Sequence, residues 1–321
     1  MIRAAGLTRT FTRGKEKVAA VKQVDLEVGE GELIAFLGPN GAGKSTTLRM
    51  LTGLLAPTAG TAVVAGADVV SHPEVVRRRI GYIGQGTGAG HYYRVRDELV
   101  TQGRFYGLGR AESRQRAGEL MEALQLEGLE KRTVQTLSGG QRRRLDVAMG
   151  LMNRPRLLFL DEPSTGMDPQ SRANLWEHIL RMRTEYAMTI VLTTHYLEEA
   201  DRMAERVVVI DHGSVVADAA PEALRLEHAD DVITCTVAPA DAAAARAALA
   251  ESPELAAALD PDGQERLVLT LDRGADILPR VIRQIDSAGV AIRSATIAEA
   301  TLDDVFLNLT GRSLREEGTA A

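Results

Sequence analysis

Short hydrophobic runs alternate with longer amphipathic stretches along the first two thirds of the chain. The run GELIAFLG ends in glycine and is followed by KSTTLRMLTGLL, whose leucines recur at helical spacing. This order predicts a buried strand, a loop and a helix. Runs that are apolar on both faces indicate a largely parallel sheet covered by helices, so the predicted fold class is α/β. Three more runs predict buried strands: RLLFL at 156–160, TIVLTT at 189–194 and RVVVID at 206–211.

Two regions depart from this alternation. Residues 95–135 mix charged and apolar positions at helical spacing without a strand-like run, which predicts a helical insertion over about residues 95–152. Beyond residue 220, the segments DVITCTV, ERLVLTL and VAIRSATI alternate with helical patterns and predict a small α+β domain. We therefore expect an α/β domain over 1–219, the small domain over 220–311 and a flexible tail over 312–321.

The composition is that of a soluble globular protein. Of 321 residues, 26% are charged and 45% are hydrophobic, and the formal net charge is −6. The arginines are mixed with acidic residues rather than gathered in one basic tract. A surface that neutralises many phosphates of DNA is therefore not expected, and we predict no nucleic-acid partner.

The single cysteine, Cys235, excludes a disulfide within the chain and a thiolate cluster for a metal. Its position in the alternation VITCTV predicts a buried strand residue. The segment MIRAAGLTRTF lacks the apolar core of a signal peptide, and no run approaches the roughly 20 apolar residues that cross a bilayer. We therefore expect a cytoplasmic chain, and any membrane span in its work would come from another polypeptide.

The segment GPNGAGKST fits a phosphate-binding loop at every fixed position and lies between a predicted strand and a predicted helix. A chance glycine-rich turn is the alternative, and this context argues against it. Glycines let backbone N–H groups surround phosphate oxygens, while Lys44 reaches the β and γ phosphates of ATP and Ser45 binds Mg²⁺. The predicted nucleotide-binding residues are Gly38, Pro39, Asn40, Gly41, Ala42, Gly43, Lys44, Ser45 and Thr46.

Two further strand ends carry polar side chains. In LLFLDEP, Asp161 is placed to bind Mg²⁺ and Glu162 to take a proton from the attacking water. His195 ends the run TIVLTTH and would orient that water or contact the γ phosphate. Solvated acids and a structural histidine are the alternatives. The presence of the phosphate-binding loop favours the catalytic interpretation, because ligands bind at the carboxyl edge of such sheets.

A second glycine-rich turn, LSGGQ, opens the helical pattern RRRLDVAMGLM. Its N–H groups and the Ser138 hydroxyl could hold another anion. An ordinary helix N-cap is the alternative. Because the helical insertion separates this turn from the phosphate-binding loop, we expect it to contact the γ phosphate held by another copy, in a two-fold homodimer with ATP between the subunits. The turn contributes Ser138, Gly139, Gly140 and Gln141.

The ordered motifs GPNGAGKST, LSGGQ, LLFLDEP, STGMD and TTH resemble those of the ATP-binding subunits of ABC transporters over roughly residues 2–218. The resemblance implies an ATPase that uses ATP and Mg²⁺. It also implies that Gln85 contacts Mg²⁺ and relays nucleotide state to a membrane partner, that Asp168 communicates across the dimer, and that Phe11 stacks on adenine. A core phenylalanine is the alternative for Phe11. After Gln85 the segment GTGAGHYYRVRDEL lacks the usual LT…EN pattern, so contacts with the partner are open there.

The segment TLDDVFLNLTG at 301–311 narrows the resemblance to the daunorubicin-resistance type of bacterial drug-export ATPase. That type implies a separately encoded permease, a place at the cytoplasmic face of the cell membrane, and export of hydrophobic drugs or lipids. By itself, LDDVFLNL is an amphipathic helix that would pack on the small domain or on a second copy.

Two other functions were weighed against transport. A non-transport ABC ATPase acting on nucleic acid or the ribosome would have a long coiled coil or two cassettes, and the sequence has neither. A regulatory module that binds ATP without turnover would lack the carboxylate or the signature serine. Both Glu162 and Ser138 are present.

Overall fold

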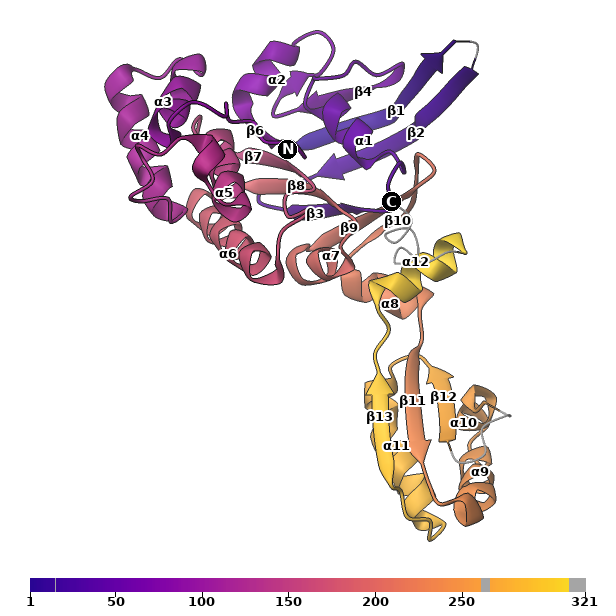
Figure 1. Cartoon of the computed structure of the whole chain (residues 1–321). Coiled ribbons are helices and arrows are strands. Elements are labelled where there is room, and N and C mark those ends of the chain that lie inside the picture. Colours follow the sequence, from indigo (N-terminus) through magenta and orange to yellow (C-terminus); the bar gives the residue numbers. More distant parts are fainter. Residues whose placement is uncertain (15, 261–265, 312–321) are drawn as a thin grey trace. The chain divides into compact units, whose positions relative to one another are not determined.

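The structure is a computed structural model that describes residues 1–14, 16–260 and 266–311. The chain divides into two compact units, Met1–Asp218 and Ala219–Ala321, and each is described by itself (Figure 1). The predicted tail over 312–321 lies outside the described residues. Among the described residues, no helix combines the length and the apolar character needed to cross a membrane.

A six-stranded sheet forms the centre of the first unit, with the strand order β10-β9-β3-β8-β7-β6. The pairs β3/β8, β3/β9, β7/β8 and β6/β7 are parallel. Every residue of β3, β7 and β8 is buried, because helices and a second sheet cover both faces. The predicted α/β class is therefore confirmed. The strands are β3 (Leu33–Leu37), β6 (Ile80–Ile83), β7 (Leu157–Asp161), β8 (Thr189–Thr194), β9 (Arg206–Asp211) and β10 (Ser214–Ala219).

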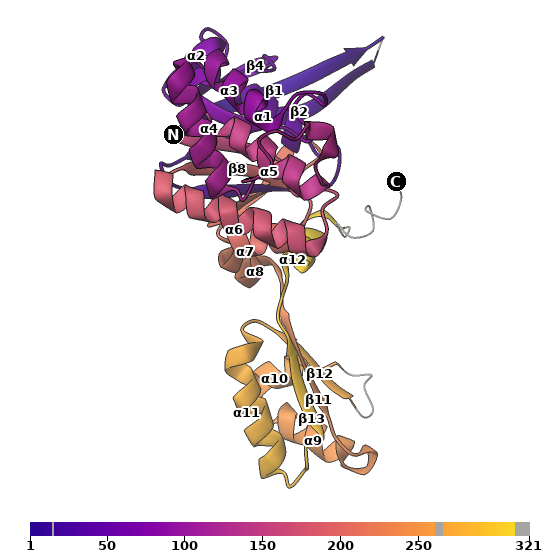
Figure 2. The same cartoon turned by 60° about the vertical axis from the view of Figure 1, so that its left-hand side comes forward.

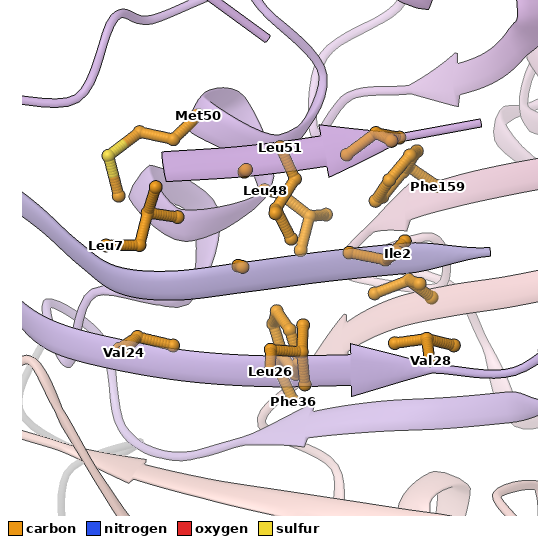
Figure 3. Packing of buried hydrophobic residues seen from close by; sticks show 14 of the residues in the cluster. Ile2, Leu7, Val24, Leu26, Val28, Phe36, Leu48, Met50, Leu51 and Phe159 are labelled. Carbon is orange, nitrogen blue, oxygen red and sulfur yellow. The ribbon is translucent and has the colours of Figure 1, made fainter. Parts of the chain in front are cut away.

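The sequence analysis did not predict a second, antiparallel sheet with the order β2-β1-β4-β5. Its strands bury one face only, so charged residues interrupt their apolar pattern. Helix α1 (Lys44–Leu51) contacts this sheet through β2 and β4 and the parallel sheet through β7. Figure 3 shows the resulting core, in which Leu48 and Leu51 of α1 lie among side chains from β1, β2, β3 and β7. The strands are β1 (Ile2–Arg13), β2 (Glu16–Val28), β4 (Ala59–Val64) and β5 (Ala67–Asp68).

Residues 95–152 contain helices joined by loops. They form α3 (Val95–Phe105), α4 (Arg110–Ala123), the short helix η1 (Val134–Thr136) and α5 (Gly139–Gly150). In Figure 1 these helices gather beside the β6 edge of the parallel sheet. The other helices of the unit are α2 (Pro73–Arg79), α6 (Pro169–Tyr186) and α7 (Leu197–Met203).

The second unit has an antiparallel sheet of order β12-β11-β13 with helices packed against it (Figure 2). Cys235 of β11 is fully buried in the core between them, as its alternation predicts, and burial raises the pKa of its thiol. The TLDDVF segment forms α12 (Leu302–Thr310), which packs against α8 (Pro221–His228). The remaining elements are β11 (Asp231–Thr236), η2 (Pro239–Asp241), α9 (Ala242–Ala250), α10 (Pro253–Ala258), β12 (Arg266–Leu271), α11 (Gly274–Ser287) and β13 (Ser294–Ala298).

Candidate active site

The phosphate-binding loop joins the end of β3 to the start of α1 in a backbone path that requires glycine. Gly38 has φ 157°, Gly41 81° and Gly43 108°, conformations that other L-residues rarely adopt. A Cβ on Gly43 would lie 2.5 Å from the carbonyl oxygen of Ala20, and one on Gly38 would lie 2.1 Å from that of Ile210. The surrounding chain therefore fixes the shape of the loop.

Lys44 lies inside this loop rather than in solvent. Its side chain is 4% exposed, and Nζ donates to the carbonyl oxygens of Gly38 at 2.6 Å and Pro39 at 3.0 Å. The same Nζ lies 3.7 Å from Oε1 of Glu162. The ammonium group is thus held at the mouth of the glycine-rich loop, where it would contact a phosphate.

Oxygen-bearing side chains converge beside Lys44 from three strand or helix ends. The Ser45 hydroxyl donates to Oδ1 of Asp161 at 2.7 Å, and Nε2 of Gln85 donates to the Ser45 hydroxyl at 3.2 Å. Thr193 also donates to Oδ1 of Asp161, and the Tyr82 hydroxyl lies 3.4 Å from Oδ2. A hydroxyl, a carboxylate and an amide are hard oxygen donors of the kind that Mg²⁺ prefers. No group of three or more His, Cys, Asp or Glu side chains suited to a metal occurs among the described residues.

Glu162 follows β7 directly and has φ 47°, an uncommon conformation for a residue with a side chain. Its N–H donates to the Thr193 hydroxyl at 3.0 Å. Oε2 lies 3.4 Å from Nδ1 of His195 and accepts a hydrogen bond from Thr165 at 3.2 Å. The interaction with His195 and the charge of Lys44 lower the pKa of Glu162, although burial opposes them. The carboxylate is therefore ionised at neutral pH and able to accept a proton.

The Ser138 turn begins α5 with a reciprocal cap. The Ser138 hydroxyl accepts from the N–H of Gln141 at 3.2 Å, and the Ser138 N–H donates to the Gln141 side chain at 3.0 Å. The N-cap alternative therefore describes this turn correctly, and it leaves both Ser138 and Gly139 exposed. A Cβ on Gly139 would meet only open space, so the turn has room for a ligand. Gly139 also lines a cavity of about 160 Å³ together with Gln85 and Glu162.

Two more predicted residues lie outside this cluster of contacts. Asp168 caps α6 by accepting from the N–H of Ser171 at 2.9 Å, and hydrogen bonds from Ser171 lower the pKa of Asp168. Phe11 lies on β1 with 40% of its surface exposed, and the Arg9 guanidinium lies 4.7 Å from the centre of its ring. The alternative that made Phe11 a core residue is therefore wrong.

Sequence reasoning missed three residues that contact the predicted ones. Thr193 binds both Asp161 and Glu162, and it was visible as the third residue from the end of the run TIVLTTH. Tyr82 lies in IGYIGQ, three residues before Gln85. Arg143 sits within a run of three arginines and is buried, a burial that a charged run does not indicate.

Comparison with known families matches residues 21–165 to the ABC transporter family. The doxorubicin resistance ATP-binding protein DrrA of Mycobacterium tuberculosis (strain H37Rv) is 39% identical over 310 residues, which are 95% of this chain and 92% of that protein. The daunorubicin/doxorubicin resistance ATP-binding protein DrrA of Streptomyces peucetius is 38% identical over 99% of this chain and 94% of its own. The Nod factor export ATP-binding protein I of Paraburkholderia xenovorans is 37% identical over 92% and 93%.

Solved structures of ATP-binding cassettes share the fold. A dimeric cassette in a post-hydrolysis state, bound to ADP and phosphate, has a TM-score of 0.64 and 27% identity over 68% of this chain and 98% of its own. CbiO1 of Clostridium perfringens, part of the ABC transporter complex CbiONQ, has a TM-score of 0.63 and 25% identity over 70% and 89%. The chain is therefore an ATPase of the ABC transporter family, and it belongs to the daunorubicin- and doxorubicin-resistance type of ATP-binding protein.

Proposed function

We propose that two copies of this chain hold two MgATP between them, at the cytoplasmic face of the cell membrane, and drive a separately encoded permease that exports hydrophobic drugs or lipids. One observation carries the proposal. The ionised Glu162 carboxylate lies 3.7 Å from Lys44 and adjoins the hydrogen-bonded pair of Ser45 and Asp161, so base, phosphate ligand and metal ligands meet at one sheet edge.

The chemistry follows from these positions. The backbone N–H groups of residues 38 and 40–46 and the Lys44 ammonium bind the β and γ phosphates. Ser45, Asp161 and Gln85 would hold Mg²⁺, which supplies positive charge to the phosphate oxygens. Water attacks the γ phosphorus, its proton passes to Glu162, and the bond from phosphorus to the ADP oxygen breaks. His195, 3.4 Å from the Glu162 carboxylate, orients that water.

Each site is completed by the second copy. The exposed Ser138 turn of one subunit, with Gly139, Gly140 and Gln141, closes over the γ phosphate that its partner binds. The open space above Gly139 supports this role. Phe11 stacks on adenine, which its exposure allows, and Asp168 contacts the opposite site. A dimeric relative of the same fold is known with ADP and phosphate.

Complementation tests the shared site. A Lys44→Ala chain has a defective phosphate-binding loop, and a Ser138→Arg chain has a blocked turn, so each alone should lose turnover. In an equal mixture half of the dimers are mixed and each has one of its two sites intact, so about a quarter of wild-type turnover should return. If each site lay within one chain, the mixture would remain as inactive as its parts, and the shared-site model would be wrong.

We place the permease contact on the loop and helix that follow Gln85. Tyr92 and Phe105 are each 82% exposed, and Tyr93 is 66% exposed, an unusual density of exposed aromatic residues in a chain with few aromatics. Phe105 also lines a cavity of about 450 Å³ between α3 and α2. A cytoplasmic helix of the permease with an apolar face fits this surface. A movement of this permease helix would displace Gln85, because Gln85 lies on the same loop.

Co-purification with the permease tests this contact. Phe105→Ser should lower the amount of permease recovered while the free chain keeps its basal ATPase activity. Val216→Ser on β10 is the matched control, because Val216 is likewise an exposed apolar residue, with 40% of its surface accessible, but it lies outside the proposed surface. Equal recovery of the permease with both variants would refute the assigned surface and leave the ATPase proposal intact.

The cargo is proposed from the relatives, whose names refer to doxorubicin, daunorubicin and Nod factor. Daunorubicin should stimulate ATP hydrolysis by the chain in complex with its permease. If no compound in a panel of hydrophobic drugs and lipids changed the rate of ATP hydrolysis, the cargo assignment would be wrong, and the ATPase proposal would stand. No observation favours a nucleic-acid partner, since the net charge is −6.

A further inference from the structure

Arg143, on the second turn of α5, is buried and makes its hydrogen bonds with the backbone around the catalytic carboxylate. Its side chain is 9% exposed. The guanidinium faces four carbonyl oxygens: Pro163 at 2.5 Å from Nε, Gly84 at 2.7 Å from Nη1, and Glu162 and Asp161 at 3.4 Å and 3.5 Å from Nη2. One side chain therefore contacts three consecutive carbonyls of the Glu162 segment and one at the end of β6.

This segment needs support because Glu162 has φ 47°, a strained conformation for a residue with a Cβ that persists only where its surroundings hold it. Two groups hold it from opposite directions. The Thr193 hydroxyl accepts from the Glu162 N–H at 3.0 Å, and Arg143 donates to the carbonyls before, at and after the turn. The direction in which the Glu162 carboxylate points is set by this backbone conformation.

The same helix also holds the loop that carries Gln85. One turn after Arg143, Oδ1 of Asp146 accepts from the Gly88 N–H at 2.9 Å, and its Oδ2 lies 3.9 Å from Nη1 of Arg143. Glu98 accepts from the Gly90 N–H at 3.1 Å. Backbone N–H groups of a glycine-rich stretch are thus bound by carboxylates from α5 and α3.

A second set of contacts joins this loop to the residues just before Ser138. The N–H of Val134 donates to the Tyr93 carbonyl and the N–H of Gln135 to the His91 carbonyl, each at 3.0 Å. The Gln85 loop is therefore fixed to α5 through Asp146 and to the segment preceding the Ser138 turn.

At its other end, α5 packs on β6 without room for adjustment. A Cβ on Gly81 would lie 2.4 Å from the carbonyl oxygen of Gly150, and one on Gly150 would lie 2.8 Å from Ile83. Because these two glycines allow such close packing, the end of α5 is held firmly against β6. The Ser138 turn, Arg143 and Asp146 therefore belong to one helix whose far end is packed closely on β6.

We propose that Arg143 is a positioning residue for Glu162, and that Arg143 and Asp146 together couple the catalytic carboxylate to the Gln85 loop through α5. The proposal rests on the assignment of Glu162 as the catalytic base. Arg143 acts through the backbone of the Glu162 segment, to which its guanidinium donates. The same helix begins with the Ser138 turn, so closure of that turn on one nucleotide reaches the base that acts on the other.

The geometry requires arginine rather than a positive charge alone. A guanidinium presents five N–H donors in a planar fork, and this fork reaches Gly84 on one side and residues 161–163 on the other. A lysine ammonium is a point donor that keeps the charge but cannot reach both sides. Arg143→Lys therefore removes the support while leaving a cation in place.

The first measurement compares Arg143→Lys with Arg144→Lys. Arg144 is the matched control, because it is the next residue on α5 but contacts Gln125 and Asn174 instead of the Glu162 segment. Arg143→Lys should lower kcat about 10- to 100-fold, the effect of a small displacement of a catalytic group, with KM for ATP and ATP binding unchanged. Arg144→Lys should leave kcat unchanged. A loss confined to KM, or an equal loss in both variants, would overturn the proposal.

The second measurement is a double-mutant cycle with Glu162→Gln, read as single turnovers with excess enzyme. If Arg143 acts through Glu162, Arg143→Lys slows the wild type but adds no further loss to Glu162→Gln. A multiplicative loss refutes positioning. The same cycle is measured with Arg143→Gln. If one of the two Arg143 variants fails to fold, which would show as a loss of ATP binding, the other variant still tests the proposal. A Glu162→Gln chain with full turnover would instead refute the assigned base and thus the proposed function.

Discussion

Replacement of Glu162 by glutamine tests the central assignment with little disturbance of the fold. The amide has the shape of the carboxylate, and its oxygen can still accept the hydrogen bond that Thr165 donates at 3.2 Å. Lys44 loses the carboxylate 3.7 Å away but keeps the carbonyl oxygens of Gly38 and Pro39. The midpoint of thermal unfolding should therefore remain close to that of the wild type, and the effect should fall on the chemical step.

The expected loss follows from the state of the carboxylate. The lowered pKa of Glu162 keeps it ionised wherever the pH exceeds its usual value of 4.5, so the wild type has its base in the active form over the whole neutral range. Removal of a positioned general base costs about 10²- to 10⁴-fold in rate, or about 2.7–5.4 kcal/mol in activation free energy. The ratio of wild-type to Glu162→Gln turnover should not change between pH 6 and pH 8 through titration of this group.

Two assays read the result. Phosphate release gives the turnover, and size-exclusion chromatography with MgATP gives the oligomeric state. We expect slow turnover together with a stable dimer, because bound ATP is no longer consumed. Glu185→Gln is the control, since Glu185 is exposed on α6. A Glu162→Gln chain that stays monomeric in ATP, or one that hydrolyses ATP at the wild-type rate, would refute the reasoning.

Three further predictions concern the framework. Gly43→Ala should abolish ATP binding, and its φ of 108° alone should lower the free energy of unfolding by about 1–3 kcal/mol. Gly118→Ala, at an open helical position, should instead raise the free energy of unfolding by about 0.5–1 kcal/mol. Urea unfolding measures the stability of each variant, and nucleotide titration measures its ATP binding. Cys235 should react with Ellman's reagent only after unfolding, because it is fully buried and its pKa is raised; rapid reaction with the native chain would contradict this. Burial raises the pKa of Asp146 above 3.8, so the folded state binds the extra proton and loses stability as pH rises through that raised pKa. Relative to Asp146→Asn, the free energy of unfolding of the wild type should therefore fall as the pH rises above 4, and a rise would show that the sign is wrong.

Local patterns in the sequence were enough to predict the phosphate-binding loop and the parallel strands β3, β7, β8 and β9, whereas the short strand β6 was not predicted. The runs before Gly38, Asp161 and His195 are largely apolar, so their burial in a parallel sheet could be read directly, and such strands end at one edge. Glycines at 38, 41 and 43 similarly indicated a loop whose backbone N–H groups can surround a phosphate, and in the structure all three have a positive φ, which only glycine adopts without strain. The contacts among Lys44, Ser45 and Asp161 follow because the phosphate-binding loop and the end of β7 lie at the same edge of the sheet.

Only the tertiary structure decided features that depend on which surfaces meet. The sheet formed by β1, β2, β4 and β5 buries a single face, so its strands resemble exposed segments in sequence, and its packing on α1 becomes visible only in the folded core. The exposure of Phe11 could not be read from its apolar character. Arg143 is the clearest case. Three consecutive arginines look alike along the chain, and the fold alone determines which guanidinium is buried against the carbonyls around Glu162, because burial depends on the helix face that packs on β6.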